Sequence, residues 1–334
     1  MQHLPVMPRE TLDGLRVRQG GRYIDGTLGG GGHAEAILRA CGPDGRLLGF
    51  DRDPEAIERV RARLAPFGHR FEAVHANFAD MASVARERGF DPVDGILLDL
   101  GVSSFQLDDP ERGFSFQNDG PLDMRMDTTR GETAAELLAR FAGDPEALAA
   151  ILRDYGEEPR AGRVASAICE AQSRAPLTTT LRLAEVVEKA LGGRRGAARH
   201  PATRTFQALR IAVNGELDAV AAGLEAGLSL LSPGGRMAVL TFHSLEDRIV
   251  KRVFAEHVGR WESLQAGGRR RIGREPAVAA VLRHPAVPGE DEQSANARSR
   301  SAKLRIVERL APATAVEGPS TAIDSLNPSA RSAT

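Results

Sequence analysis

Three features are scarce in this chain of 334 residues: cysteine, aromatic side chains and long apolar runs. The two cysteines, Cys41 and Cys169, lie far apart in sequence, which excludes a disulfide framework and a cysteine metal cluster. No segment approaches the roughly 20 consecutive apolar residues of a membrane-spanning helix, and the first residues do not form a basic flank followed by an apolar stretch. We therefore expect a globular cytoplasmic protein with no membrane-spanning segment.

An excess of charge of one sign is also lacking, because the net charge is −1 and the isoelectric point is about 6.7. This balance argues against a protein that coats nucleic acid through bulk electrostatics, so any such contact must be local. One basic cluster is typical of a solvated surface, but three of them make nucleic-acid contact an equally good interpretation. The clusters are Arg194, Arg195, Arg199 and His200; Arg269, Arg270, Arg271 and Arg274; and Arg298, Arg300, Lys303 and Arg305.

What the chain does contain is a glycine loop at residues 29–32, between a short apolar run and a helical pattern. Consecutive glycines let the backbone pass close to a ligand. The loop then continues into a helix, whose first N–H groups are free to bind that ligand. Asp51 ends the next apolar run and is placed to accept hydrogen bonds from ribose hydroxyls. Asp25, directly before the loop, would repel a pyrophosphate and attract a cation. This pattern favours S-adenosylmethionine over NAD, although a structural turn also explains a lone glycine loop.

Short apolar runs alternate with helical patterns, which is typical of an α/β fold with a parallel sheet and crossover helices. We predict strands at 22–25, 46–51, 70–75, 94–99 and 236–242, and closing strands at 278–282 and 303–310. About 137 residues separate Asp99 from the strand at Arg236, and this gap contains amphipathic helical patterns at 132–138, 145–152, 163–172 and 181–191. The gap therefore predicts an inserted helical domain.

The predicted division of the chain follows from this gap. Residues 1–105 form the first part of the main domain, 106–199 the helical insert, and 200–310 the second part of the main domain. The second part begins with one long helix from His200 through Leu228, which ends at Ser232-Pro-Gly-Gly235. Residues 311–334 are rich in Ala, Ser, Thr, Pro and Gly and predict a disordered tail.

Seven further segments, in a fixed order, point to a family. They are Gly95–Ser104, Gln106-Leu-Asp-Asp109, Gly113-Phe-Ser-Phe116, Gly120–Asp127, Tyr155-Gly-Glu-Glu158, His200–Ile211 and Phe242–Arg248. With these segments the chain, up to about Leu310, resembles the bacterial family of S-adenosylmethionine-dependent methyltransferases that modify N4 of a cytidine in 16S ribosomal RNA. The resemblance implies a Rossmann-like class I methyltransferase sheet with an inserted helical domain for RNA recognition. It also implies cofactor contacts from Gly31, Gly32, His33, Asp51, Phe78, Asp99 and Gln106, to which the charge argument adds Asp25.

Two positions depart from the family pattern. An alanine, Ala297, stands where proline is usual, and Phe105 stands where a small residue or proline is usual. Neither departure touches the cofactor segments.

The target amino group shares its lone pair with the cytosine ring, so it needs an acceptor for its N–H that frees the lone pair for the methyl carbon. We expect Ser103, Ser104 or nearby carbonyl groups to accept the amino proton, and Phe105 or a phenylalanine of residues 113–116 to stack on the base. His243 is the second candidate for proton handling or an RNA contact, although the segment 242–248 equally suits a helix cap. Neither His243 nor His33 belongs to a zinc-type spacing, so no catalytic metal is expected.

The expected partner is 16S ribosomal RNA, within the small ribosomal subunit, and a homodimer is one expected form of the protein. Two other functions fit part of the pattern. An NAD-dependent oxidoreductase would also use the loop and Asp51, but Asp25 disfavours it. A noncatalytic RNA-binding assembly factor could retain the same fold, but the intact cofactor segments argue against it.

Overall fold

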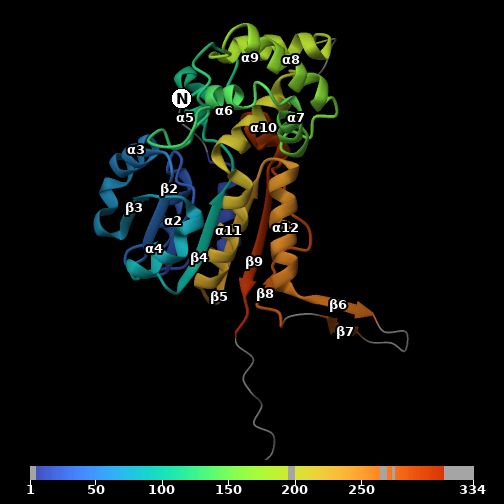
Figure 1. Ribbon diagram of the computed structural model, residues 1–334. Coiled ribbons are helices and arrows are strands. Elements are labelled where there is room, and N and C mark those ends of the chain that lie inside the picture. The colour runs from blue at the N-terminus through green and yellow to red at the C-terminus, as the bar shows by residue number, and fades with distance from the viewer. Residues whose placement is uncertain (1–4, 195–199, 264–268, 273–274, 312–334) are drawn as a thin grey trace, which may run out of the picture.

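A seven-stranded sheet forms the centre of the computed structural model, which describes residues 5–194, 200–263, 269–272 and 275–311 (Figure 1). The strand order is β3-β2-β1-β4-β5-β9-β8. The strands are β1 (Arg22–Asp25), β2 (Arg46–Asp51), β3 (Phe71–His75), β4 (Val93–Asp99), β5 (Leu231–Thr241), β8 (Val278–Ala280) and β9 (Lys303–Arg309). Strands β1 to β5 pair in parallel, whereas β9 runs antiparallel to both β5 and β8. The predicted strands are thus confirmed, and the closing strands make the sheet mixed.

Helices cover both faces of the sheet, and each face has its own buried cluster. One cluster joins α1 (Pro8–Leu15), α2 (Gly32–Ala40) and α3 (Pro54–Leu64) to the sheet. The other joins α4 (Met81–Glu87), α11 (Glu216–Leu230) and α12 (Ser244–Val258) to the opposite face. Because β2 and β4 lie on either side of β1, the chain reverses its winding there, and the carboxyl ends of β1 and β4 border a crevice suited to a ligand.

The chain between β4 and α11 forms a helical layer above the sheet, shown mainly in green and yellow in Figure 1. This confirms the predicted helical character of the insert. Its core also contains Phe206 and Leu209 of α10, so α10 packs with the insert although the sequence placed it in the main domain. The helices of this layer are α5 (Ser104–Asp108), α6 (Ala134–Arg140), α7 (Pro145–Asp154), α8 (Ala161–Arg174), α9 (Thr180–Leu191) and α10 (Thr203–Asn214).

The prediction of a single long helix from His200 to Leu228 was wrong. Helix α10 ends at Asn214 and α11 begins at Glu216, and Gly215 between them has a φ of 57°. Glycine adopts this left-handed conformation without the steric cost of a side chain. The Asn214 side chain also bonds to the insert, because it donates to the Met124 carbonyl at 2.7 Å and accepts from the Met126 N–H at 2.8 Å. The apolar pattern runs on past Gly215 because both helices bury a face.

A two-stranded hairpin that the sequence did not predict extends from the end of α12, at the lower right of Figure 1. It consists of β6 (Arg260–Ser263) and β7 (Arg269–Ile272), so the backbone of the second basic cluster lies largely on β7. A short helix, α13 (Glu290–Ala295), precedes β9. Arg195, Arg199, Arg274 and nearly all of the predicted tail lie outside the described residues.

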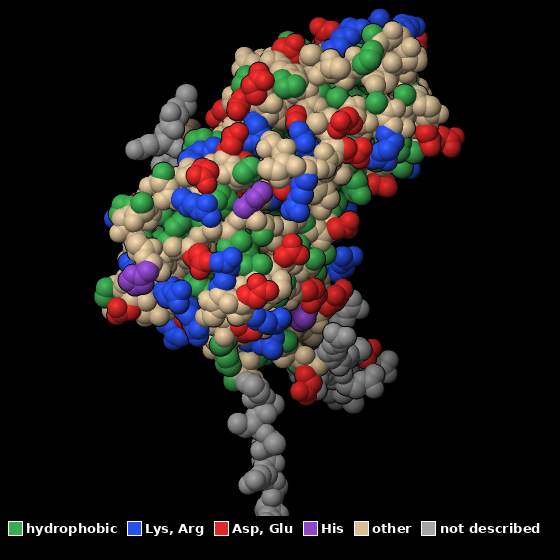
Figure 2. Space-filling view, turned by 60° about the vertical axis from the view of Figure 1, so that its left-hand side comes forward, with side chains coloured by type: hydrophobic (Ala, Val, Ile, Leu, Met, Phe, Trp, Pro, Cys, Tyr) green, Lys and Arg blue, Asp and Glu red, His purple; other side chains and the backbone are tan. Residues whose placement is uncertain are grey.

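The surface in Figure 2 mixes acidic and basic side chains, in agreement with the small net charge. Cys41 and Cys169 are both buried and unbonded to each other, as the sequence predicts. None of the helices in the described ranges combines the length and apolar character needed to cross a membrane.

Candidate active site

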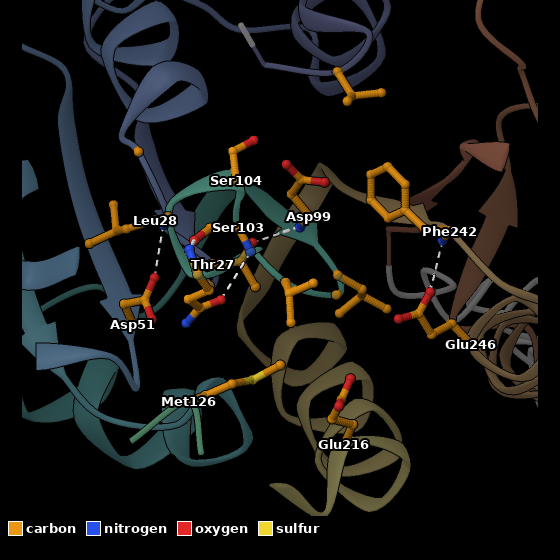
Figure 3. A pocket seen from close by; sticks show the side chains of 18 of the residues that line it. Thr27, Leu28, Asp51, Asp99, Ser103, Ser104, Met126, Glu216, Phe242 and Glu246 are labelled. Carbon is orange, nitrogen blue, oxygen red and sulfur yellow. Dashed lines mark hydrogen bonds between the residues drawn. The ribbon is translucent and has the colours of Figure 1, made fainter. Parts of the chain in front are cut away.

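A cavity of about 340 Å³ lies at the carboxyl edge of the sheet, where the segments after β1, β2 and β4 meet the insert (Figure 3). Its volume falls in the range typical of pockets for small ligands. Of the eleven predicted site residues, nine line it: Gly32, His33, Asp51, Phe78, Asp99, Ser103, Ser104, Gln106 and His243. The fold therefore brings together residues that are spread over more than 200 positions of the sequence.

The glycine loop after β1 forms the floor of the cavity. Gly29 and Gly31 have φ values of 51° and 78°, which a residue with a side chain adopts only at a cost. Gly32 and His33 line the cavity, but Gly31 does not. Gly31 is instead the N-cap of α2, and a Cβ there would lie 3.2 Å from Val60. Gly31 shapes the loop by its backbone rather than by lining the ligand space.

Asp51 lies at the end of β2 and orients the loop. One oxygen accepts the Gly29 N–H at 2.8 Å and the other accepts the Asp53 N–H at 2.9 Å. A carboxylate oxygen has two acceptor positions, so each can still accept a hydroxyl group of a ligand. Burial raises the pKa of Asp51 to about 6, against the lowering effect of these backbone donors. This arrangement suits the ribose role predicted for Asp51.

Asp25 is buried below the cavity and does not line it. It ends the central strand β1, between β2 and β4, and one oxygen accepts the Thr27 N–H at 3.0 Å. The other oxygen accepts no hydrogen bond from any described residue. Burial raises the pKa of Asp25 to about 7. Asp25 can therefore act on a ligand through its charge, but not through the direct contact expected from the sequence.

Asp99 ends β4, and its carboxylate faces the cavity (Figure 3). Its N–H donates to the Thr27 hydroxyl at 2.6 Å, which ties β4 to the loop after β1. One of its oxygens lies 3.7 Å from Nε2 of His33, while Oδ1 accepts no hydrogen bond within the described part of the chain. Burial, together with the nearby carboxylates of Asp25 and Glu246, raises the pKa of Asp99 to about 8. An acidic group in this state favours a cationic ligand or a hydrogen-bond donor.

Ser103 and Gln106 begin α5 as a reciprocal cap. The Ser103 hydroxyl accepts the Gln106 N–H at 3.3 Å, and the Gln106 side-chain oxygen accepts the Ser103 N–H at 3.0 Å. The Gln106 amide also donates to Asp53 at 2.9 Å, and the Arg112 guanidinium contacts the same Asp53 oxygen at 2.8 Å. This buried network fixes the insert against the segment that follows β2. Ser104 lines the cavity next to this cap.

His243 is the N-cap of α12, as the helix-cap interpretation of residues 242–248 predicts. Its ring nitrogens lie 3.4 Å from the Glu246 N–H and 3.1 Å from a Glu246 oxygen. Glu246 also accepts the Phe242 N–H at 2.8 Å. Burial opposes ionisation of Glu246, but His243 and Arg210 bring its pKa below the ordinary value.

The far wall of the cavity includes residues that sequence reasoning did not single out: Arg210, Glu216, Phe242, Glu246 and Met126. Arg210 donates to both oxygens of Glu216, each at 2.8 Å. Arg210, Phe242, Glu246 and Met126 fall inside segments quoted for the family resemblance, but a segment does not tell which of its side chains face a ligand.

The aromatic residues proposed to stack on a base do not line the cavity. Phe105 packs under the guanidinium of Arg59, whose central carbon lies 4.0 Å from the ring centroid. Phe114 belongs to the insert core, and Phe116 packs against the rings of His200 and Phe206. The aromatic rings that do line the cavity are those of Phe78 and Phe242. Their orientation depends on tertiary packing, which explains why the sequence did not indicate these two phenylalanines as candidates for stacking.

The donor set fits a nucleoside cofactor that has positive charge and no phosphate. Asp51 offers acceptors for a ribose, and unpartnered oxygens of Asp25 and Asp99 lie at the same edge of the sheet. A pyrophosphate would meet Asp51 and Asp99 at the wall of the cavity, whereas a sulfonium and an ammonium group would be attracted to them. The described residues contain no group of three or more His, Cys, Asp and Glu side chains arranged for a metal ion. The sheet and this site define the class of S-adenosylmethionine-dependent methyltransferases.

Comparisons with known proteins give the family. The chain belongs to the MraW methylase family, whose model matches residues 1–310. The protein named Ribosomal RNA small subunit methyltransferase H from Syntrophotalea carbinolica is 52% identical over 310 residues, which cover 92% of this chain and 98% of that protein. Proteins of the same name from Geobacter sulfurreducens and Symbiobacterium thermophilum are 51% and 49% identical, and the matches cover 92% of this chain and 99% and 96% of theirs.

These matches confirm the predicted family and enzyme class, for which S-adenosylmethionine is the cofactor, and the observed sheet with its helices agrees with the predicted fold class. They disfavour the NAD-dependent oxidoreductase and the noncatalytic factor, because the family is one of methylases. The roles of the individual site residues stay predictions that the geometry supports to different degrees.

Proposed function

We propose that this chain transfers the methyl group of S-adenosylmethionine to N4 of a cytidine in 16S ribosomal RNA, within the small ribosomal subunit. The substrate assignment is supported by the relatives, whose names specify ribosomal RNA of the small subunit and which match nearly this whole chain. The observation that supports amino-group chemistry is the Asp99 carboxylate, which lines the cavity at the carboxyl edge of the sheet.

S-adenosylmethionine supplies an electrophilic methyl group on a sulfonium when it is bound, so positioning provides much of the acceleration. The amino nitrogen of cytosine forms the new N–CH₃ bond as the S–CH₃ bond breaks, and it must lose one proton. The Asp99 carboxylate, which lines the cavity, is placed to accept a hydrogen bond from that amino group and then to hold the proton. The raised pKa of Asp99, about 8 as a result of burial and of nearby carboxylates, suits a group that accepts a proton near neutral pH.

Asp99 is better placed for this role than Ser103, whose hydroxyl already accepts the Gln106 N–H. Ser104 lines the cavity and remains a second candidate. His243 lines the cavity too, but its ring is held by Glu246 and by the start of α12. We assign Phe242 as the side chain against which the base stacks, because its ring borders the cavity opposite the cofactor loop.

Single-turnover methylation separates these candidates. Asp99→Asn keeps the size of the side chain but removes its ability to take a proton, so the rate should fall by about 100-fold or more. Ser103→Ala, Ser104→Ala and His243→Ala should each lower the rate by less than about tenfold. Cofactor affinity, measured by calorimetry on each variant, distinguishes lost chemistry from lost binding. An Asp99→Asn variant as fast as the wild type would contradict the role of Asp99.

The substrate itself is tested with cells that lack the protein. Naked 16S RNA and assembled small subunits from these cells are incubated with the purified chain and labelled cofactor, and the modified nucleotide is mapped. We expect label at N4 of one cytidine. Failure of both substrates, together with normal cofactor binding, would contradict the proposed function. Light scattering on the same material tests the predicted homodimer.

A further inference from the structure

A second cavity, of about 790 Å³, lies between the insert and the main domain. Its walls come from the turn after α7, the end of α9, the first turns of α10 and the segment that follows β5. Nothing in the methyl-transfer chemistry derived above uses this space. It is therefore a separate feature that needs its own explanation.

The second cavity adjoins the cofactor cavity. Phe242, His243 and Ser301 line both spaces, so these three residues form the partition between them. A polymer whose target base entered the cofactor cavity beside Phe242 would have its neighbouring units next to this partition. The position of the second cavity is thus suited to the part of a substrate that flanks the reacting unit.

Cations outnumber acids among the residues that line the second cavity. The cations are Arg160, Arg194, Arg204 and Lys303, and the acids are Glu157 and Glu158.

Both acids are already engaged. Glu157 contacts the Ser244 hydroxyl at 2.6 Å and Arg248 at 3.0 Å, and Glu158 accepts the Arg160 N–H at 3.0 Å. The lining therefore attracts anions.

The four cations differ in how far they are already committed. Lys303 contacts Asp247 at 3.1 Å, and Arg194 lies 3.9 Å from Glu188. The Arg160 guanidinium donates to the Leu191 carbonyl at 3.1 Å. Because this acceptor is neutral, the contact does not compensate the positive charge of Arg160.

Arg204, on the first turn of α10, is exposed and forms neither a hydrogen bond nor an ion pair by its side chain with any described residue. A guanidinium in this state can contact a phosphate without first breaking another contact.

We propose that the second cavity binds the sugar–phosphate backbone of the RNA next to the target nucleotide, with Arg204 as the main phosphate contact. The inference rests on the proposed function and extends it, because it gives the substrate strand a path across Phe242 and His243. RNA is favoured over an acidic protein segment because the cavity opens beside the site of methyl transfer. Phosphate contacts position a strand, whereas base contacts give specificity, so this cavity supplies affinity and orientation.

Three variants of the full-length chain test the proposal: Arg204→Glu, Arg204→Ala and Arg204→Lys. The control is Arg252→Glu, because Arg252 is also exposed, lies on α12 and lines neither cavity. Affinity for the small-subunit RNA is measured as a function of salt concentration. Cofactor affinity and the rate at saturating RNA are measured in parallel.

We expect Arg204→Glu to weaken RNA binding by roughly tenfold or more and Arg204→Ala to lower the salt slope by about one. Arg204→Lys should restore most of the affinity, because the charge is retained. Cofactor affinity should stay at the wild-type value in all variants, and Arg252→Glu should bind RNA normally.

RNA binding by Arg204→Glu at the wild-type level, or an equal loss in Arg252→Glu, would overturn the assignment of this cavity while leaving the proposed function intact. A second result would overturn it in favour of a protein partner. In that case Arg204→Glu loses RNA binding, but the wild-type chain binds an acidic peptide more tightly than it binds the RNA. A wild-type chain that neither binds nor methylates the RNA would instead contradict the proposed function, and the inference with it.

Discussion

Oδ2 of Asp99 lies 3.7 Å from Nε2 of His33, where the end of β4 meets the glycine loop after β1. Asp25 lies buried beneath this pair, at the end of the neighbouring strand, and raises the pKa of Asp99. The site thus concentrates acidic groups whose ionisation is unfavourable until a cation is present. This relationship links cofactor binding to proton release.

Cofactor affinity should therefore rise with pH between about 6 and 8. Without a ligand, burial raises the pKa of Asp25 to about 7 and that of Asp99 to about 8, so both groups hold protons near neutral pH. A bound cation favours the ionised carboxylates, so binding releases protons and is weaker at lower pH. The change is at most about tenfold per pH unit for each proton released. Calorimetry at several pH values in buffers of different ionisation enthalpy measures both quantities; a constant affinity would contradict the coupling.

Asp25→Asn should stabilise the ligand-free protein at high pH. The pKa of Asp25 is raised in the folded state, so its stabilising effect is complete below the unfolded pKa near 3.8 and is lost as pH rises through about 7. The amide avoids this loss, and its oxygen can still accept the Thr27 N–H. The advantage of the variant in free energy of unfolding should grow from about pH 4 to pH 8, up to roughly 4 kcal/mol. Urea unfolding at pH 4, 6 and 8 tests this, and a gap that does not depend on pH would refute it.

Gly223→Ala should weaken cofactor binding although Gly223 does not line the cavity. A Cβ at this position on α11 would lie 2.3 Å from the ring of Phe78, which does line it. The ring must move, and such overpacking costs about 1–3 kcal/mol of stability. Gly227→Ala is the control, because its Cβ would meet the flexible end of Met237 one turn further along. Equal cofactor affinity in the two variants would show that Phe78 is not held in place by Gly223.

Arg112→Ala should destabilise the protein strongly. The Arg112 guanidinium is buried, contacts Asp53 at 2.8 Å and joins the insert to the segment after β2. Its removal leaves a buried carboxylate without its cation, which costs about 3–5 kcal/mol. Arg182→Ala removes one member of an ion pair with Glu185 in which both side chains are exposed, and it should cost no more than about 1 kcal/mol. Denaturant midpoints compare the two; similar losses would argue that the Arg112 contact does not hold the domains together.

The sequence by itself determined the strands and the helical insert, and it predicted most of the residues named for the site that line the cavity. Alternating apolar runs record which segments are buried in a parallel sheet, and acidic residues at their ends mark its ligand-binding edge. The glycine loop, Asp51 and Asp99 could be predicted to lie at this edge for this reason. The break at Gly215 could not, because both flanking helices bury an apolar face and the periodicity continues through it.

Only the tertiary structure decided which side chains face the cavity. Gly31 and Asp25 belong to the cofactor segment, yet one shapes the loop and the other lies beneath it, because neighbouring positions on a loop or strand point in different directions. Phe242 faces the cavity from a segment far along the chain, whereas the nearer Phe105 packs on Arg59. Orientation of this kind depends on contacts between residues distant in sequence, so no local pattern records it.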